Sequence, residues 1–268
     1  MREPTDPLAG TGVDRTVPHS ARVWNYWLGG RDNFAVDRVA GDAWIAVQPD
    51  ITWIARAARA FLGRTVQHQV REAGIRQFLD IGTGLPTADN THEVAQRTAP
   101  EARVVYIDND PLVLAHARAL LTSGPLGATR FLLADMNDPV GLIAAATEAL
   151  DLDQPIGVQF IGVLGHVPHL GTARALVRGL MERACAGSHL TIADGTLLDA
   201  PTLLAQDAYA RTGAVPYRNR PAEEIASLFE GLVWVEPGLV EVTRWRPDPA
   251  DGDGTAPVDM LGGMARKG

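Results

Sequence analysis

The sequence predicts a doubly wound α/β fold: a mainly parallel sheet of seven strands, a helical cap at the N-terminus and an antiparallel hairpin at the end. Two observations lead to this prediction. From Arg76 onward, short runs rich in β-branched and aromatic residues alternate with helical stretches, which implies right-handed crossovers between parallel strands. Near the end, Leu232–Val235 and Leu239–Trp245 are both β-rich, and the three residues between them are too few for a parallel crossover.

Length and composition are those of a globular protein. The chain has 268 residues, of which 46% are hydrophobic and 21% charged, enough to bury a full core in one large domain. Its 24 basic and 32 acidic side chains give a net charge of −8, so we expect no nucleic-acid partner. The sequence has no apolar run of 18 residues, and its single cysteine, Cys185, cannot form an internal disulfide. We therefore expect a cytoplasmic protein with no membrane partner; the sequence does not indicate an oligomeric state.

The chain divides into four predicted segments. Residues 1–18 are interrupted by proline and glycine and predict a flexible tail. Residues 19–74 carry helical apolar stripes and predict a helical cap. The α/β domain occupies residues 75–247, and residues 248–268, rich in Asp, Gly and Pro, predict a loosely held tail. Three helices are expected in the cap: one that stops at Gly29-Gly30, one over Phe34–Val47 and one over Ile51–Ala73.

Within the α/β domain the elements alternate in order. The expected parallel strands are Gln77–Ile81, Arg103–Ile107, Arg130–Ala134, Ile156–Ile161 and Ser188–Ala193. The expected helices are Thr91–Thr98, Pro111–Thr122, Pro139–Leu150, Gly171–Ala186, Pro201–Arg211 and Pro221–Phe229. Two of these helices begin with Asp-Pro, in which the aspartate caps free N–H groups and the proline has no N–H to leave unpaired.

The first expected strand ends in a pattern typical of ligand binding. Asp80 is followed by Gly82, Thr83 and Gly84. Glycine permits positive φ and lets a ligand approach backbone N–H groups. Alone, this pattern is also compatible with an ordinary tight turn.

Acidic residues also end the next two strands. Asp108 lies 24 residues after Gly84, where a carboxylate can accept hydrogen bonds from both hydroxyls of a ribose. Asp135 could accept from an exocyclic amine while Met136 packs on a purine face. Because the carboxyl ends of parallel strands share one edge of the sheet, the three acids together predict a site for an adenosine-type ligand.

The residues after Gly84 narrow the choice of ligand. Leu85-Pro86-Thr87 contain no third glycine, which argues against a dinucleotide, and no Gly-Lys-Ser/Thr follows to form a phosphate loop. An acid at the end of the first strand suits a cationic ligand by Coulomb attraction. S-adenosylmethionine, which carries a sulfonium and an ammonium, fits this charge pattern.

These features resemble class I S-adenosylmethionine-dependent methyltransferases, whose Rossmann-like sheet ends in an antiparallel strand. More narrowly, Ala21–Phe34 (ARVWNYWLGGRDNF) is similar to the N-terminal signature of an actinobacterial methyltransferase-like family long catalogued as a domain of unknown function. Other blocks that resemble this family are Phe78–Thr87, Val104–Pro111, Ala134–Pro139 and Trp234–Gly238. The resemblance implies S-adenosylmethionine as the cofactor and does not specify a methyl acceptor.

The resemblance also implies roles for individual positions. The methionine part would be surrounded by Asp80, Gly82, Thr83 and Gly84, and the ribose would be held by Asp108 with Asn109 beside it. Asp135 and Met136 would face the adenine, and Gly162 would lie near the amine of the ligand. Within the N-terminal signature, Trp24, Trp27 and Phe34 are expected in the core of the cap. We expect this segment to close over the cofactor with Tyr26 on the lining of the pocket.

Candidate catalytic residues are few. His166 and His169 follow the fourth strand, and a histidine there could take a proton from an oxygen or nitrogen acceptor. A plain loop histidine is the alternative, because methyl transfer to a good nucleophile needs only alignment. No third ligand at a supportive spacing accompanies the two histidines, so no metal is expected. Asp194-Gly195, at the end of the fifth strand, either lines the acceptor pocket or forms a turn.

The predicted function is therefore methyl transfer from S-adenosylmethionine to a small-molecule acceptor. One alternative is a non-catalytic S-adenosylmethionine-binding sensor or interaction protein, because no catalytic base is compelling from the sequence. A nucleotide-dependent oxidoreductase is less favoured, because the third glycine is missing.

Overall fold

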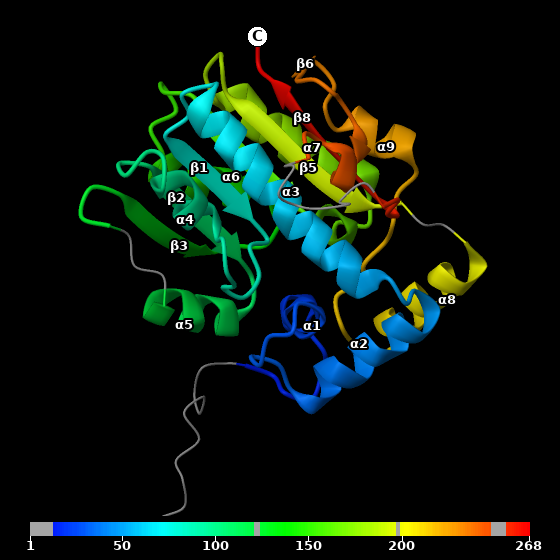
Figure 1. Ribbon diagram of the computed structural model, residues 1–268. Helices are drawn as coiled ribbons and strands as arrows, with labels where there is room; N and C mark the ends of the chain where they lie inside the picture. Colours follow the sequence, from blue (N-terminus) through cyan, green and yellow to red (C-terminus); the bar gives the residue numbers. More distant parts are fainter. Residues whose placement is uncertain (1–12, 121–123, 197–198, 248–255) are drawn as a thin grey trace, which may run out of the picture.

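The computed structural model describes residues 13–120, 124–196, 199–247 and 256–268. It contains a mixed eight-stranded sheet in the order β3-β2-β1-β4-β5-β8-β6, with β7 also paired to β8 (Figure 1). Five strands are parallel: β1 (Gln77–Ile81), β2 (Arg103–Asp108), β3 (Ala128–Leu133), β4 (Ile156–Ile161) and β5 (His189–Gly195). The doubly wound α/β fold is confirmed, and these strands end within two residues of their predicted positions.

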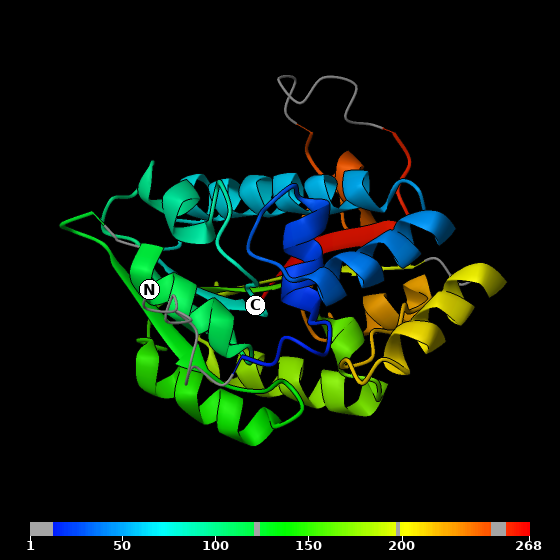
Figure 2. The same cartoon turned by 90° about the horizontal axis from the view of Figure 1, so that it is seen from below.

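Helices cover both faces of the sheet, so that the strands form the middle layer in the end-on view of Figure 2. Helices α3 and α4 lie on one face, and α6 and α7 on the other. The central strands are buried on both sides, as in β1, where all five residues are buried. The helices are α1 (Ser20–Trp27), α2 (Ala35–Val47), α3 (Ile51–Arg71), α4 (Thr91–Gln96), α5 (Pro111–Leu120), α6 (Pro139–Ala149), α7 (Leu170–Arg183), α8 (Ala200–Ala210) and α9 (Ala222–Ser227), with short 3₁₀ turns at Leu164–His166 and Val242–Arg244.

The predicted terminal hairpin is wrong. The strands β6 (Val233–Trp234) and β7 (Val240–Glu241) do not pair with each other; both pair antiparallel with β8 (Met260–Arg266). From Trp234 to Val240 the chain advances six residues, while the partner positions on β8 move three, from Ala265 to Gly262. The two short strands therefore follow one edge of β8 in succession, and the residues between them bulge out of the pairing.

The predicted loose C-terminal tail is also wrong where the structure describes it. Strand β8 pairs antiparallel with β5 along its whole length, from His189–Arg266 to Gly195–Met260, and most of it is buried. A Cβ at Gly262 would lie 2.7 Å from Cζ of Phe61 and one at Gly263 3.0 Å from Cζ3 of Trp234, so the glycines make room for these rings. The other part of the predicted tail, residues 248–255, lies outside the described residues.

The N-terminal helices form two groups. Helices α1 and α2 pack together near the lower end of the sheet in Figure 1, whereas α3 crosses the sheet and contacts β4, β5 and β8. Phe61 of α3 meets Trp245 edge to face, with ring centroids 5.6 Å apart. The third helix of the predicted cap is therefore a layer of the α/β sandwich, and α1 and α2 are left as the cover of the sheet end.

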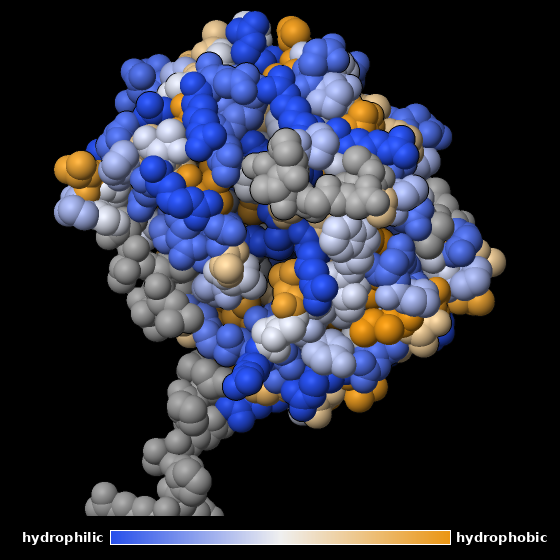
Figure 3. Space-filling view, viewed as in Figure 1, coloured by the Kyte–Doolittle hydropathy of each residue, from blue (hydrophilic) through white to orange (hydrophobic). Residues whose placement is uncertain are grey.

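The visible surface is mostly polar. The face shown in Figure 3 is predominantly hydrophilic, with apolar side chains in small separate patches. None of the helices in the described part of the chain is both long enough and apolar enough to cross a membrane.

Candidate cofactor site

A cavity lies where the carboxyl ends of β1, β2 and β4 meet α1 and α3; we call it the strand-end cavity. It brings together side chains that are far apart in the sequence, including Asp80, Asp108 and Asp135. The predicted cofactor residues that line it are Asp80, Gly82, Thr83, Gly84, Asp108, Asn109, Asp135, Met136 and Gly162. The prediction that the three acids surround a common cavity is therefore confirmed by their placement.

Asp80 stands at the buried end of β1. It is 4% exposed, and its Oδ2 accepts a hydrogen bond of 2.6 Å from Oγ1 of Thr91 on α4. Burial raises the pKa of Asp80, while the Thr91 hydroxyl and the positive charge of Arg59 act in the opposite direction. An added cation would relieve the cost of burying this carboxylate.

Asp108 ties the glycine turn to the end of β2. Its Oδ2 accepts from the N–H of Gly84 at 2.9 Å, and its Oδ1 accepts from the N–H of Asp110 at 2.9 Å. Burial raises the pKa of Asp108, and these two backbone donors lower it. Each carboxylate oxygen retains a further lone pair, so the side chain can still accept from neighbouring hydroxyls.

Asp135 and Met136 form the outer part of the cavity, beyond the end of β3. Asp135 is exposed, and its Oδ1 accepts from the backbone N–H of Asn137 at 2.8 Å and from Nδ2 of the same residue at 3.1 Å. Met136 is half-buried and packs against the main hydrophobic core. A flat group in this position would meet a thioether on one side and a carboxylate at its edge.

Gly162, just past β4, lies against a side chain of α1. Its φ is +68°, and a Cβ there would lie 2.9 Å from Cζ2 of Trp24. The absence of a side chain therefore allows the Trp24 ring to lie over the strand end. This contact closes one side of the strand-end cavity.

His166 lines the same cavity, whereas His169 is exposed and lines neither this cavity nor the second one described below. The Nδ1 of His166 lies 2.9 Å from the carbonyl oxygen of Pro216. Burial lowers the pKa of His166 to about 4, so the ring is neutral near pH 7. Because a carbonyl only accepts, the proton belongs on Nδ1, and Nε2 keeps its lone pair.

The predicted place of Tyr26 on the cavity lining is wrong. Its hydroxyl donates to Oδ1 of Asp42 at 2.6 Å, and its ring packs against Gly41 of α2. Trp24 and Asn25 line the strand-end cavity instead. At 100° per residue, positions 24 and 26 point to nearly opposite sides of α1, a signal that helical periodicity already contains.

Arg59 of α3 is a cavity residue that the sequence reasoning missed. Its Nη2 donates to the carbonyls of Ala88 and Asp89 at 3.3 and 3.0 Å, while its Nε is buried without a hydrogen-bond partner among the described residues. Burial lowers the pKa of Arg59, and the nearby Asp80 opposes this shift. The available signal was its position on the apolar face of α3, four residues after Ala55 and three before Leu62.

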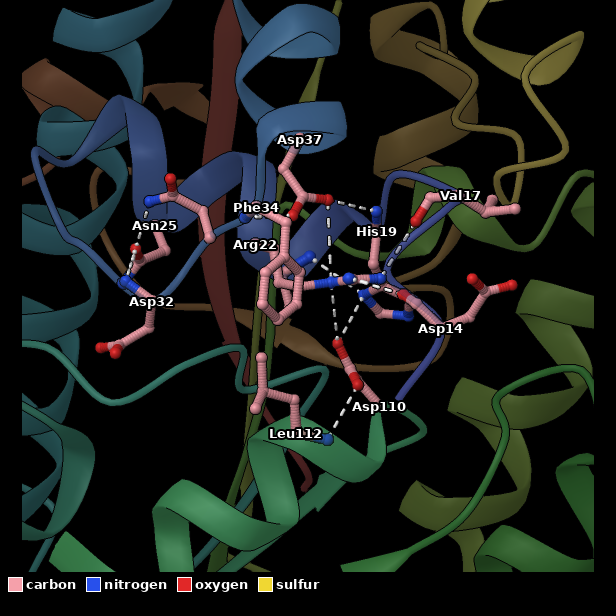
Figure 4. Close-up of polar contacts among 12 residues, drawn as sticks. Asp14, Val17, His19, Arg22, Asn25, Asp32, Phe34, Asp37, Asp110 and Leu112 are labelled. Carbon is pink, nitrogen blue, oxygen red and sulfur yellow. Dashed lines mark hydrogen bonds and ion pairs between the residues drawn. The ribbon is translucent and has the colours of Figure 1, made fainter. Parts of the chain in front are cut away.

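A buried ionic cluster holds α1 against the turn that carries Asp108 (Figure 4). Nε of Arg22 lies 3.7 Å from Oδ1 of Asp37 and 3.5 Å from Oδ2 of Asp110. Asp110 also accepts at Oδ1 from the N–H of Leu112 at 2.9 Å, as predicted for the cap of α5, and its Oδ2 lies 3.3 Å from Nδ1 of His19. The start of α1 is thereby linked to the end of β2.

Arg22 also holds the chain that precedes α1. Its guanidinium donates to the carbonyls of Asp14 and Val17 at 2.8 and 3.2 Å (Figure 4). The prediction of a flexible tail over residues 1–18 is therefore wrong for this stretch, and residues 1–12 lie outside the described residues.

The residues around the strand-end cavity fit a ligand with the charges of S-adenosylmethionine. The unpartnered Nε of Arg59 can donate to a carboxylate, and the buried Asp80 can accept from an ammonium. Asp108 lies at the end of β2 on the same lining, and Met136 and Asp135 lie at the outer end. Over the described part of the chain, no group of three or more His, Cys, Asp or Glu side chains is placed to hold a metal ion.

Comparison with known proteins gives the same answer. The family model of the S-adenosyl methyltransferases matches residues 7–268. A DUF574 family protein from Streptomyces avermitilis is 42% identical, with a TM-score of 0.89, covering 95% of this chain and 99% of that chain. A candidate methyltransferase from Thermobifida fusca is 35% identical, with a TM-score of 0.82, covering 98% and 99%.

More distant structures share the fold alone. A SAM-dependent methyltransferase from Anabaena variabilis is 16% identical, with a TM-score of 0.51, covering 86% of this chain and 95% of that chain. No curated protein matches the chain. The match of the family model over nearly the whole sequence, together with the 42% identity to a relative aligned over 95% of the chain, shows that this chain belongs to the S-adenosyl methyltransferase family.

Proposed function

We propose that this S-adenosylmethionine-dependent methyltransferase acts on a small-molecule acceptor and that the strand-end cavity holds its cofactor. The observation that carries the proposal is the convergence of Asp80, Asp108 and Asp135 on one cavity, beside the unpartnered Nε of Arg59. When bound, S-adenosylmethionine supplies a methyl group attached to a positively charged sulfur.

The inner end of the cavity takes the methionine part. Nε of Arg59 donates to the carboxylate, and Asp80 attracts the ammonium and the sulfonium. The Gly82-Thr83-Gly84 turn brings backbone close to the ligand without side-chain obstruction. Because Asp80 is shielded from bulk water, its interaction with a bound charge is stronger than it would be at the surface, whereas Arg59 is half-buried.

The rest of the cavity takes the nucleoside. Asp108 accepts hydrogen bonds from the ribose hydroxyls, with Asn109 beside it, and keeps the glycine turn in place through its bond to Gly84. Asp135 and Met136 hold the adenine. Gly162 leaves room for Trp24 to exclude water from the side of the reacting methyl group.

A small acceptor is favoured by the cover over the cavity and by the charge of the chain. Helix α1, held down by the ion pairs of Arg22, lies across the end of the sheet and covers part of the strand-end cavity. The net charge of −8 disfavours a nucleic acid. No observation favours the non-catalytic sensor considered from the sequence.

Calorimetry tests the proposal. We expect S-adenosylmethionine and S-adenosylhomocysteine to bind and NAD to bind far more weakly. Asp108→Ala should weaken S-adenosylmethionine by at least about 10-fold, because bonds to a charged acceptor contribute about 1.5–3 kcal/mol. Asp153→Ala, an exposed acid outside the cavity, is the matched control and should change nothing. Tighter binding of NAD, or equal effects of the two substitutions, would overturn the assignment.

A further inference from the structure

A second cavity adjoins the strand-end cavity. The two cavities share Ser20, Trp24 and His166 on their linings. The second cavity extends from these residues between α1, α2 and the start of α3 toward α8 and the end of β5. A molecule bound there would meet the cofactor across the Trp24–His166 boundary.

The walls of the second cavity are aromatic. They include Trp24, Trp27, Trp44, Tyr209 and Tyr217. Trp24 and Trp27 meet edge to face with ring centroids 5.8 Å apart, and Trp27 and Trp44 do so at 6.5 Å. Several flat faces at different angles favour a flat aromatic guest over a flexible chain.

The charge of the lining favours an uncharged guest. Among the described residues that line the second cavity there is no Lys or Arg, and Asp259, which is exposed, is its one Asp or Glu. An anionic guest would therefore lose its hydration without gaining a counter-ion.

Two polar groups of the second cavity are suited to a hydroxyl. Nδ1 of His166 is committed to the carbonyl of Pro216, which leaves the Nε2 lone pair as an acceptor. The hydroxyl of Tyr209 is buried and has no hydrogen-bond partner among the described residues. Tyr217, by contrast, already donates to Asp194, and its ring holds the His166 ring edge to face at 5.0 Å.

Asp194 and Gly195, at the end of β5, lie next to Tyr217 on one side of the second cavity. Gly195 lines the second cavity, whereas Asp194 is fully buried behind it, between Tyr217 and Arg220. Nη1 of Arg220 lies 3.4 Å from Oδ2 of Asp194, and the guanidinium also donates to the carbonyl of Val167. Asp194 is therefore a positioning residue for Tyr217 and His166 rather than a lining residue.

We propose that the second cavity is the methyl-acceptor site and that it takes an uncharged aromatic compound whose hydroxyl group meets His166. The proposal rests on the cofactor assignment above. An oxygen electron pair forms the new bond to the methyl carbon, and the hydroxyl proton, which becomes strongly acidic as that bond forms, passes to Nε2 of His166. The carbon–sulfur bond breaks with its electron pair left on sulfur, and His166 then returns the proton to solvent.

The first test is calorimetry on the full chain saturated with S-adenosylhomocysteine. The probes are 2-naphthol, naphthalene-2-sulfonate and cyclohexanol. We expect 2-naphthol to bind at least about 10-fold more tightly than the other two. Equal binding of the sulfonate, or no preference for the aromatic alcohol, would overturn the proposal. Binding of S-adenosylhomocysteine itself is measured separately, so failure of the cofactor assignment is distinguishable.

A tryptophan pair locates the binding site. Trp44 lines the second cavity and does not line the strand-end cavity. Trp53 of α3 is 38% exposed and lines neither cavity. Trp44→Leu should lower the affinity for 2-naphthol by about 5-fold or more and leave the affinity for S-adenosylhomocysteine unchanged. Trp53→Leu should change neither affinity. Retained 2-naphthol affinity in Trp44→Leu would place the probe elsewhere and contradict the proposal.

The role of His166 has its own readout, independent of activity and of overall folding. In the wild type, 2-naphthol should bind about 3- to 10-fold more tightly than naphthalene, the difference expected for one net hydrogen bond. In His166→Ala this preference should disappear, although both probes still bind. A preference of the same size in the variant would remove His166 from the acceptor site.

Discussion

Two glycines of the strand-end cavity have the same backbone conformation but different surroundings. Gly84 and Gly162 have φ of +66° and +68°. A Cβ at Gly84 would meet nothing within 4 Å, whereas one at Gly162 would press on the Trp24 ring. An alanine at either position has the left-handed strain, and only at Gly162 must a neighbour also move.

Alanine substitutions at these positions separate the two effects. Gly84→Ala should lower the free energy of unfolding by about 1–2 kcal/mol, the cost of a left-handed residue. Gly162→Ala should cost at least about 1 kcal/mol more, since Trp24 must shift, and overpacking typically costs that much. Urea unfolding measures both variants. Equal losses of unfolding free energy in the two variants would show that the Trp24 ring can move aside without an energetic cost.

The role proposed for Arg59 rests on its Nε, which is buried without a hydrogen-bond partner among the described residues. We expect Arg59→Met to weaken S-adenosylmethionine by about 10-fold or more, because the carboxylate loses a charged partner. Arg59→Met should leave the affinity for 5′-methylthioadenosine unchanged, because that ligand has no amino-acid part. Arg56→Met, an exposed position on the same helix outside the strand-end cavity, is the control. If both ligands weaken together, Arg59 acts on the shape of the cavity and does not bind the carboxylate.

At the scale of elements, α1 is held at its N-terminal end by charge. Arg22 and Asp110 are each 3% exposed and Asp37 is fully buried, so these charges depend on one another rather than on water (Figure 4). One turn further along the same face, α1 is joined to α2 by the exposed bond from Tyr26 to Asp42. The two contacts should therefore contribute very differently to stability.

Substitution at Arg22 and at Tyr26 checks this difference. Arg22→Met leaves Asp37 and Asp110 without their cation and should cost about 3–5 kcal/mol of unfolding free energy. Tyr26→Phe removes one exposed hydrogen bond and should cost less than about 1 kcal/mol. Chemical denaturation of both variants decides the matter. Similar losses would mean that the ionic cluster does not hold α1 in place.

At the scale of the whole molecule, three buried groups make stability depend on pH below about 6.5. Burial lowers the pKa of His166 and of His189 from 6.5 to about 4, so the unfolded chain takes up these protons first as pH falls. Burial raises the pKa of Asp194 from 3.8 to about 6, so there the native state takes up the proton first. The histidines therefore destabilise the native state as pH falls from 6.5 to 4, and Asp194 opposes them between 6 and 4.

His189→Gln isolates one of these groups, because His189 lies outside both cavities. The wild type should lose stability relative to this variant by about 1.4 kcal/mol for each pH unit below 6, the slope for one proton. Urea unfolding of both proteins at pH 6.5, 5.5 and 4.5 gives the difference. A difference that does not change with pH would show that His189 titrates alike in both states.

Much of the fold and part of the site follow from sequence alone, for a local reason. Strands β1, β2 and β4 are apolar along most of their length because both faces are buried, and α6 starts at a local signal, Asp138-Pro139. Once the strands are known to be parallel, their carboxyl ends must share an edge. That geometry is sufficient to place Asp80, Asp108 and Asp135 together.

The tertiary structure decided what depends on contacts between distant segments. The adjacent Gly262 and Gly263 indicate a loop when read locally; they belong to a central strand because Phe61 and Trp234 occupy the space of the missing side chains. Helical periodicity separates Trp24 from Tyr26, but the placement of α1 and α3 on the sheet decides that Trp24 and Arg59 line the strand-end cavity and that Tyr26 does not. Local patterns encode which residues are buried, whereas packing between elements determines which polar atoms are left for a ligand.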